Sequence, residues 1–545
     1  MKLKFNNKIL IAFFFLSYLI LGLNIFKDYG VSFDEETSRL YGLTNGNYIL
    51  KKFLSEEKYN NLFNSITENK FKVKISKKKP TELDKFPDRA YGAAFELPLA
   101  ALEILFNIKD EKNVFLFRHL INFLFFFTSC IYFFFLLKKI FKKDYIAFFG
   151  VLLLITNPRI FANSFYNSKD IIFLSFFIIS NFYGYNLLSS KNKSDLLFFC
   201  FFSACLINIR LIGIIVPVLI CFIIFLYDLK NKKLFNTKII QIIFLTSIFL
   251  YLIWPFLWED TINKLIFIYN YFSNLNPLDS MYNGELLQGD RLPWHYLPVW
   301  ILITSPSFIT ILFIFGLIFL IANLKKKLNF DKIYLSCSLC LFLGLPLFYV
   351  IFSNLSLYDG WRHFYFFYPV IIKISLISFY YFFGIKNSFI KKTFFTFFIV
   401  FLLHSVYTIY KLHPHQYLYF NNLIVKNGLK NFEKDYWGLS NKIVLEQFLK
   451  KNKKGEIIYS FHGSMFPTSL LAVHKTQRKR FIKFSEVSSS YDGPIYYFIN
   501  NRDKIDYDKI NKHSDVVFEF IFNGVLINGV YKFDNADNFN IAFNE

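Results

Sequence analysis

The feature that most constrains the fold of this chain is a series of apolar runs, each bounded by charged residues and close to the length of a membrane-spanning helix. A bilayer core of about 30 Å is crossed by roughly 20 apolar residues in a helix. Eleven runs fit, at about residues 8–26, 117–137, 145–162, 170–189, 195–209, 211–227, 238–256, 303–322, 333–353, 364–384 and 394–410. The sequence therefore predicts an all-α polytopic membrane protein.

Composition and cysteine usage agree with this class of protein. Of the 545 residues, 54% are hydrophobic and 21% aromatic, and only 19% are charged, which lies outside the usual range of soluble proteins. The six cysteines all lie in apolar runs, without the paired spacing of a zinc site or of a secreted disulfide framework. The first run follows lysines as a signal peptide would, but no small-residue cleavage site follows it, so we expect an uncleaved anchor.

The loops between the runs predict the orientation, because short cytoplasmic loops collect Lys and Arg. One alternation of loops is consistently basic, through Lys138, Lys139, Lys142 and Lys143; Lys191 and Lys193; Lys230, Lys232 and Lys233; Lys325 to Lys327; and Lys386, Lys391 and Lys392. The N-terminus is thus predicted inside, with residues 27–116, 163–169, 257–302, 354–363 and the tail from 411 outside. In a bacterium this is the periplasmic side of the inner membrane. The net charge of +23 is then a topology signal and does not indicate a nucleic-acid partner.

One further apolar run, residues 90–106, is nearly long enough to cross the membrane. If it did cross, every later basic loop would move to the outer side. Glu96 and Glu103 also interrupt it. We therefore predict a helix that lies on the outer membrane interface.

Three consecutive acids, Asp34, Glu35 and Glu36, follow the first apolar run. Asp34 is eight residues beyond Phe26, at most about 12 Å along a helix, so it is expected at the outer membrane–water boundary. A carboxylate there could take a proton from an acceptor hydroxyl when a lipid-linked substrate is presented at the surface. The alternative is that the acids only cap the next helix and favour its dipole.

Several stretches together resemble a family. An acidic pair after the first span, an outer interfacial helix, an Arg that opens the second span (FLFRHLINFLFFF) and an Asp after the third (NPRIFANSFYNSKD) look like the membrane glycosyltransferases of the GT-C fold. The likeness is to bacterial relatives of protein O-mannosyltransferases and lipid A aminoarabinose transferases, and it covers roughly residues 5 to 440. WPFLWED, LPWHYLPVWILITSP, YDGWRHFYFFYP and LHPHQYLYFNNLI…FEKDYWGLS are similar to segments of an uncharacterised bacterial branch.

The resemblance implies transfer of a sugar from a polyprenyl-phosphate donor, with inversion, to an envelope glycan, lipid or protein acceptor at the outer face. By position, Asp34 matches the first-loop acid, with Glu35 as its neighbour or substitute, and Asp170 matches the second-loop acid. The motif residues Arg118 and Lys169 are carried over as substrate-binding candidates. The extra acid Glu36 leaves open which carboxylate is the base, and we favour Asp34 because the aspartate that opens the acidic pair matches the family pattern.

Other candidates come from the chemistry of a leaving phosphate, which needs cationic donors. Arg362 and His363 stand at an outer span end, where the alternative is an interfacial anchor belt. Arg210, between two short apolar runs, is expected to bind a phosphate or to pair with a buried acid.

Glu285 and His295 lie on the outer loop before the eighth span, where they could contact sugar hydroxyls or the acceptor; an ordinary solvated loop is the alternative. No grouping of His, Asp and Glu demands a metal, and no cofactor is implied with certainty. Asp34 and Asp170 could nevertheless meet around a divalent cation.

The tail beyond the last span predicts a second unit. GEIIYSF, PIYYFIN and VVFEFIFNGVLINGVYKF are typical of strands, the last with an Asn-Gly turn, and LSNKIVLEQFLKKN is typical of a helix. We predict a GT-C-like transmembrane domain at residues 1–410, with a first periplasmic loop at 27–116, and a small periplasmic α/β domain at 411–545 that binds the acceptor or supports the site.

The main alternative function is a polytopic transporter or flippase of a lipid-linked glycan. Such proteins usually have repeated halves and polar sites at the bilayer midplane. This chain has no evident internal repeat, and its polar candidates gather at the outer boundary.

Overall fold

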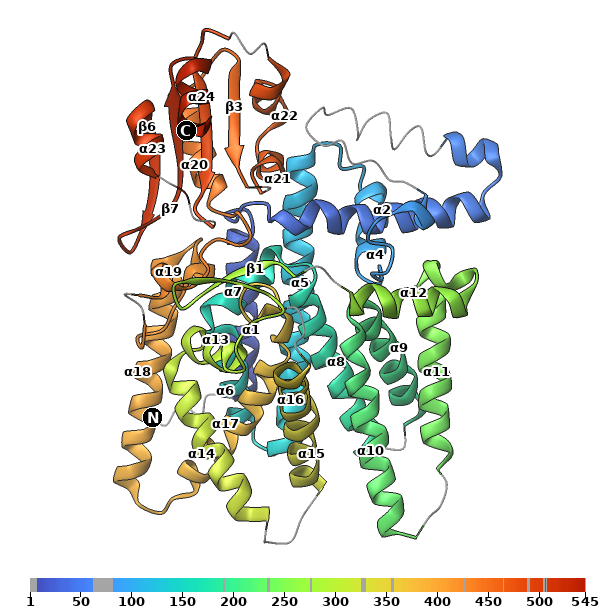
Figure 1. Ribbon diagram of the computed structural model, residues 1–545. Helices are drawn as coiled ribbons and strands as arrows, with labels where there is room; N and C mark the ends of the chain where they lie inside the picture. Colours follow the sequence, from blue (N-terminus) through green and yellow to red (C-terminus); the bar gives the residue numbers. More distant parts are fainter. Residues whose placement is uncertain are drawn as a thin grey trace.

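A computed structural model describes residues 7–61, 82–189, 192–232, 236–274, 277–324, 330–353, 357–424, 427–463, 465–487, 491–502, 505 and 507–544 of the chain. Long helices run side by side in a bundle, and a small sheet domain sits at one end of it (Figure 1). The mostly helical architecture with a C-terminal α/β unit is as the sequence predicts. The prediction of a domain division at residue 411 remains a prediction.

Within the described residues, seven helical segments are long and apolar enough to cross a membrane. They lie in α1 (Asn7–Ile25), α5 (Glu111–Phe141), α8 (Asp170–Ser189), η2 with α10 (Leu211–Ile214 and Ile215–Lys230), α15 to α16 (Phe330–Leu339, the π-turn Cys340–Gly344, and Leu345–Phe352), α17 (Phe367–Gly384) and α18 (Ser388–Leu412). Two bent helix pairs raise the number to nine. The multi-span prediction is confirmed, whereas the count of eleven and the orientation remain predictions.

Two of the eleven predicted spans are not straight single helices, because each is broken by a sharp bend. The predicted span 145–162 is broken into α6 (Asp144–Ile155) and α7 (Pro158–Tyr166), which meet at 71°. Pro158 cannot continue the hydrogen-bond ladder, and the side chain of Asn157 caps α7 by accepting from the N–H groups of Arg159 and Ile160. A similar break divides 303–322, where α13 (Tyr296–Thr304) and α14 (Ser307–Leu324) meet at 118°.

The remaining two predicted spans form apolar helices of 17 residues each. They are α9 (Lys193–Ile209) and α11 (Thr237–Ile253), and they pack side by side at one edge of the bundle (Figure 1). Each ends at the level where α12 (Thr261–Ser273) crosses the bundle end.

The end of the bundle that carries the sheet domain also carries the shorter elements. These are α2 (Phe33–Phe53), η1 (Leu83–Lys85), α4 (Glu96–Leu105), η3 (Pro255–Trp258), α12, the hairpin of β1 (Asp279–Tyr282) and β2 (Glu285–Gln288), η5 (Arg362–Phe364), η6 (Gln416–Leu418) and α19 (Gly428–Asn431) (Figure 1). The predicted interfacial helix at 90–106 is α4, whose ten residues are too few to cross a membrane. Its two acids are buried in ion pairs, Glu96 with Arg118 and Glu103 with Arg39.

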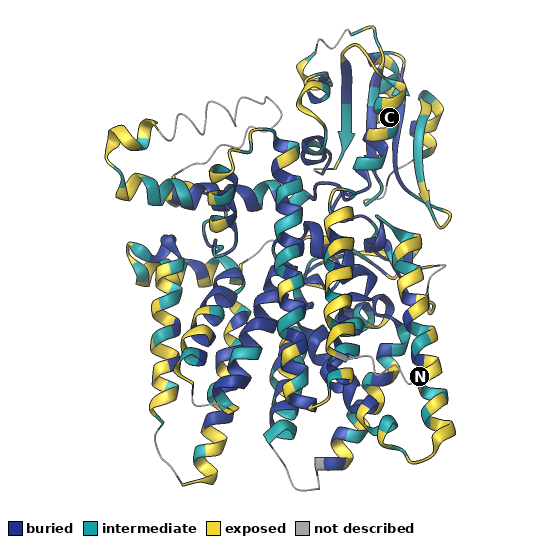
Figure 2. Ribbon diagram, turned by 180° about the vertical axis from the view of Figure 1, so that it is seen from behind, coloured by how far each residue is buried: buried dark blue, intermediate teal, exposed yellow. Residues whose placement is uncertain are grey.

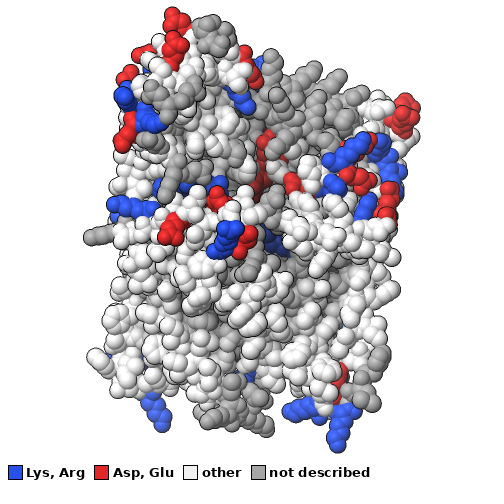
Figure 3. Space-filling model, in the orientation of Figure 1, with Lys and Arg blue, Asp and Glu red and all other residues white. Residues whose placement is uncertain are grey.

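The outer surface of the bundle is apolar between its two ends (Figure 3). Large apolar side chains stay exposed there, among them Phe13, Ile243 and Phe397, while the interior between the helices is buried (Figure 2). Such a surface suits lipid rather than water. The junction of α5 with α6 and the start of α18, which carry the predicted inner lysines 138–143 and 391–392, lie at the end opposite the sheet domain (Figure 1). Lys191, Lys233 and Lys325 to Lys327 lie outside the described residues.

The C-terminal unit is a five-stranded mixed sheet in the order β4-β3-β5-β7-β6. Its strands are β3 (Ile457–His462), β4 (Phe481–Lys483), β5 (Ile495–Asn500), β6 (Asp515–Phe522) and β7 (Val525–Phe533), with helices α20 (Asn441–Lys451), α21 (Phe466–Ser469), α22 (Lys475–Arg478), α23 (Tyr507–His513) and α24 (Ala536–Asn544). β3, β4 and β5 are parallel, and β6–β7 is a hairpin. Its turn, Asn523–Gly524, has positive φ at both residues, as the Asn-Gly pair predicts.

Candidate active site

Two carboxylates from distant parts of the chain face one guanidinium at the end of the bundle beneath the sheet domain. Asp34 lies in the first turn of α2, and Asp170 is the first residue of α8. Arg362, in η5, places Nη1 at 3.6 Å from Asp34 Oδ2 and also at 3.6 Å from Asp170 Oδ2. The structure thus brings together three of the residues that the sequence singles out.

The local sequence explains how Asp34 is presented. The Glu35 side chain accepts a hydrogen bond of 2.6 Å from the N–H of Ser32, which closes the first turn of α2. The N–H of Phe33 donates to the backbone oxygen of Trp437 at 3.0 Å. Asp34 remains uninvolved in the capping, and its side chain is 32% exposed.

Asp170 is held differently, because its side chain is fully buried. It pairs with Arg210, the residue at which α9 ends, and it accepts a hydrogen bond of 3.0 Å from the side chain of Asn167. Asn167 in turn accepts from the N–H of Asp170 at 2.8 Å and so caps α8. Of the two readings of Arg210, the pairing with a buried acid is the one observed, and Asp170 serves as a fixed counter-ion.

Lys169 adds a third cation beside this pair. Its Nζ lies 3.7 Å from the ring centre of Tyr91 and 4.8 Å from that of Tyr41, in cation–π geometry. Burial lowers the pKa of Lys169 to about 8, although the negative charge of Asp34 acts in the opposite direction. The amine is therefore mostly protonated near neutral pH.

Two of the three residues of η5, Arg362 and His363, differ in charge. Burial alone would lower the pKa of Arg362, but Tyr436, Asp170 and Asp34 raise it above its usual value. His363 has a pKa well below its usual value because it is buried and because Arg210 and Arg362 are near. Arg362 is thus a permanent cation and His363 a neutral ring. Lys169 and Arg210 add two further cations near the carboxylates of Asp34 and Asp170.

The space between Asp34 and Asp170, which the sequence analysis considered for a divalent cation, is taken by the Arg362 guanidinium. In the described ranges of the chain, no group of three or more His, Cys, Asp or Glu side chains is arranged to hold a metal ion.

Glu35 and Arg118 lie apart from this cluster. Glu35 Oε1 lies 2.9 Å from Nε2 of His119, in addition to its capping contact, and the residue is 1% exposed. Arg118 pairs with Glu96 of α4 and is fully buried. The capping alternative therefore describes Glu35, and Arg118 joins α5 to α4. Their catalytic and binding roles remain predictions that this geometry does not favour.

Glu285 and His295 lie around the β1–β2 hairpin. Glu285 begins β2 and is exposed, and His295 Nδ1 lies 2.6 Å from the hydroxyl of Tyr282. The next residue, Tyr296, accepts from the N–H of Gly360 at 3.1 Å and so supports the loop that precedes Arg362. Contact of Glu285 or His295 with a sugar or an acceptor remains a prediction.

The structure adds aromatic residues that the sequence analysis did not single out. Besides Tyr91, the rings of Tyr436 and Trp437 lie 4.0 and 4.7 Å from the Arg362 guanidinium carbon. Both belong to the stretch FEKDYWGLS, which the resemblance to the family already includes. That stretch is the signal that could have pointed to them.

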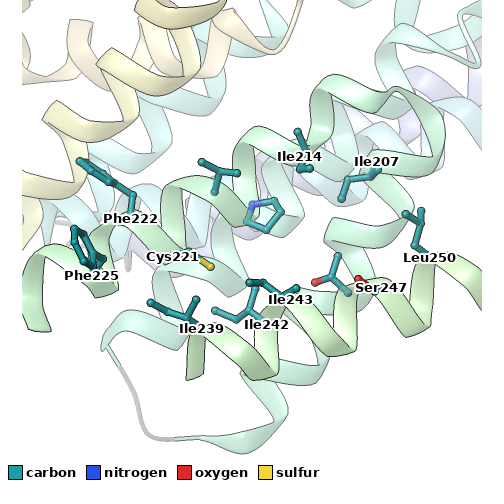
Figure 4. A pocket seen from close by; sticks show the side chains of 13 residues that line it. Ile207, Ile214, Cys221, Phe222, Phe225, Ile239, Ile242, Ile243, Ser247 and Leu250 are labelled. Atoms are coloured by element: carbon teal, nitrogen blue, oxygen red, sulfur yellow. The ribbon is translucent and has the colours of Figure 1, made fainter. Parts of the chain in front are cut away.

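An apolar groove of about 550 Å³ opens on the bundle surface among α9, α10 and α11 (Figure 4). Ile207 and Ile214 line one end of it, and these residues flank Arg210 in the chain. Pro217, Phe222, Ile243 and Leu250 line its length. The groove therefore begins near a charged residue of the cluster and continues along the apolar surface of the bundle.

Comparison with known proteins gives structural likenesses only. No family model matches the sequence, and no curated protein matches it either. Among solved structures, the chain is similar to ArnT from Cupriavidus metallidurans bound to undecaprenyl phosphate, with 11% identity and a TM-score of 0.47, over 96% of this chain and 97% of that one. It is also similar to the apo state of the same protein, with 9% identity and a TM-score of 0.47, over 97% and 98% of the two chains.

Proposed function

We propose that this protein is a membrane glycosyltransferase that moves a hexosyl or pentosyl group from a polyprenyl-phosphate donor to an envelope glycan, lipid or protein acceptor. The observation that carries the proposal is the pair of carboxylates around Arg362, one partly exposed and one buried, with Lys169 and Arg210 beside them. The reaction takes place at the outer, periplasmic face of the bacterial inner membrane, in line with the orientation that the basic loops predict.

The cations bind the phosphate of the donor. Arg362 offers a planar set of N–H donors, and Lys169 offers a mobile point charge. As the bond between the sugar carbon and the phosphate oxygen breaks, negative charge grows on the leaving polyprenyl phosphate, and fixed cations in a partly buried site stabilise it. Asp170 holds Arg210 and Arg362 in place, since its buried carboxylate pairs with both.

Asp34 is the general base of the proposed reaction. Its carboxylate is the more exposed of the two, and its ion pair with Arg362, at 3.6 Å, is longer than a hydrogen bond, so a substrate hydroxyl can reach it. It accepts the proton of the acceptor hydroxyl while that oxygen attacks the sugar carbon from the side opposite the phosphate. The configuration at that carbon is inverted, and the polyprenyl phosphate leaves with the electron pair.

The polyprenyl chain occupies the groove among α9, α10 and α11. Its lining is almost wholly apolar, and Ile207 and Ile214, which line one end of it, flank Arg210 in the chain. A lipid chain in the groove and a phosphate at its end match the two chemical halves of the donor.

The test compares Asp34→Asn with Glu36→Gln. Both changes remove a carboxylate from the same helical turn, and only Asp34 faces Arg362. A deletion strain is complemented with the wild type or with either variant at equal membrane levels, and its envelope glycans are analysed by mass spectrometry. We expect the wild type and Glu36→Gln to restore a sugar that Asp34→Asn does not restore.

Two other outcomes would revise the proposal. Full restoration by Asp34→Asn removes this residue as the base. If the deletion strain instead accumulates an unmodified lipid-linked glycan on the inner side of the membrane, a flippase replaces the transferase.

A further inference from the structure

A short segment before the sheet domain enters the site from above. Residues 433–440, here called the wedge, connect α19 to α20. Asp435 fixes its shape by accepting from the N–H groups of Leu439 and Ser440, at 3.0 and 2.8 Å, and from the side chain of Asn500 at 3.2 Å. Asn500 ends β5, so the wedge is bound to the sheet domain.

The wedge touches the cationic side of the site through two rings. Tyr436 and Trp437 lie over the Arg362 guanidinium at 4.0 and 4.7 Å. The Tyr436 ring also lies 5.0 Å from the guanidinium of Arg502, so this ring contacts two arginines. Arg502 follows β5 and donates to Asp359 Oδ2 at 2.7 and 3.1 Å, in the loop that leads to Arg362.

The wedge also touches the carboxylate side. The backbone oxygen of Trp437 accepts the N–H of Phe33, the residue before Asp34. Two adjacent residues of the wedge therefore contact both the turn that presents Asp34 and the guanidinium that faces it. A shift of the wedge changes the position of both groups.

We propose that Tyr436 is a positioning residue that holds the Arg362 guanidinium in place for the phosphate of the lipid-linked donor, and that the sheet domain sets this position through Arg502. The inference rests on the proposed function and deepens it. The two rings lie over the guanidinium and so fix the direction of the Nη1 group that faces Asp34 and Asp170. The predicted acceptor-binding or supporting module is, on this reasoning, part of the donor site.

The experiment measures binding of decaprenyl phosphate and of decaprenol to the full-length protein in nanodiscs. Tyr436→Phe keeps the ring and removes only the hydroxyl, whereas Tyr436→Leu removes the ring. We expect Tyr436→Phe to bind decaprenyl phosphate within about twofold of the wild type and Tyr436→Leu to bind it roughly 5- to 30-fold more weakly, as the loss of a cation–π contact implies. Decaprenol, which lacks the phosphate, is expected to bind equally to all three proteins.

The two lipids separate a positioning role from a loss of structure. A general disturbance of the fold would weaken binding of decaprenol as well, and that result overturns the inference. Equal binding of decaprenyl phosphate to Tyr436→Leu and to the wild type also overturns it. If the wild type itself binds decaprenyl phosphate no better than decaprenol, the proposed function fails instead.

A second variant serves if Tyr436→Leu does not fold. Arg502→Gln leaves the ring in place but removes the charged contact with Asp359, while Arg502→Lys preserves the charge. We expect weaker binding of decaprenyl phosphate to Arg502→Gln and partial recovery in Arg502→Lys. Wild-type affinity in Arg502→Gln would contradict the role of the sheet domain.

Discussion

The buried ion pair between Arg478 and Glu111 offers the sharpest test of how the sheet domain is held on the helical bundle. Arg478 ends α22 in the sheet domain, and Glu111 begins α5 in the bundle. The side chains are 1% and 9% exposed. Val31, Phe115 and Leu471 form an apolar cluster that also joins the two parts. The perturbation is Arg478→Met, which keeps an unbranched, flexible side chain and removes its charge.

The free-energy cost of this substitution follows from the burial of the ion pair. Removal of one partner of a buried pair leaves an uncompensated charge and costs about 3–5 kcal/mol. If this cost falls on the docking of the sheet domain, the undocked population rises by roughly 150- to 5,000-fold, since each 1.36 kcal/mol is a factor of ten. The double variant Glu111→Leu with Arg478→Met should regain most of the loss. Arg478 Nε and Nη2 have no hydrogen-bond partner in the described part of the chain, so the native pair already carries a desolvation cost that an apolar pair avoids.

Hydrogen–deuterium exchange with mass spectrometry measures this effect on the protein in nanodiscs. Local opening equilibria determine the exchange of protected amides. Peptides that contain Phe33, whose N–H is bound to Trp437, should exchange far faster in Arg478→Met and almost normally in the double variant. The ion pair would not hold the sheet domain if Arg478→Met changed the exchange rate by less than about tenfold. The same conclusion would follow if the change in opening free energy of the double variant equalled the sum of the changes in the two single variants.

Two further predictions concern the donor site. Lys169 has a pKa of about 8, so its positive charge is lost as the pH rises through that value. The affinity for decaprenyl phosphate should therefore fall between about pH 7 and 9. Lys169→Arg, which stays charged, should abolish this fall. A pH dependence that persists in Lys169→Arg would assign it to another group. Ile243→Trp places a large ring in the groove of about 550 Å³ and should weaken binding of decaprenyl phosphate at least about fivefold. Binding of a short-chain lipid such as geranyl phosphate should remain unchanged. Equal effects on both lipids would exclude the groove as the binding site of the polyprenyl chain.

Much of the architecture follows from local sequence patterns, and the exceptions have identifiable causes. Runs of apolar residues suffice to predict the long helices, and the alternating strands and the Asn-Gly turn predict the β6–β7 hairpin. The breaks at Asn157–Pro158 and between α13 and α14 were missed because apolar composition continues across them. A cap and a proline determine the bend at the first of these breaks, and neither changes the hydropathy of the run.

The site could be predicted residue by residue but not as a set of contacts. The places of Asp34 and Arg362 at span ends and the resemblance for Asp170 single these residues out, yet the meeting of two carboxylates at one guanidinium depends on helix packing that no local pattern encodes. The sequence leaves two possibilities for Arg210, phosphate binding or pairing with a buried acid, and the pair with Asp170 becomes visible only in the structure. Tyr436 is one of 35 tyrosines in a chain with 76 phenylalanines, so its residue type alone does not single it out, and only its place in FEKDYWGLS could have done so.

The distribution of charge bears on the choice between transfer and transport. A transporter binds its cargo near the bilayer midplane and opens to both sides. Deep within this bundle, Lys373 of α17 is buried with its Nζ 5.3 Å from the ring of Tyr334, and in the described ranges it has no hydrogen-bond partner. A single buried lysine does not provide a polar binding site for a glycan at the middle of the bundle. The buried ion pairs of Asp170 with Arg210 and Arg362 lie instead at one end, beneath a sheet domain whose preceding segment contacts Arg362. That one-sided arrangement suits a reaction between a lipid-linked donor and an acceptor from the same side.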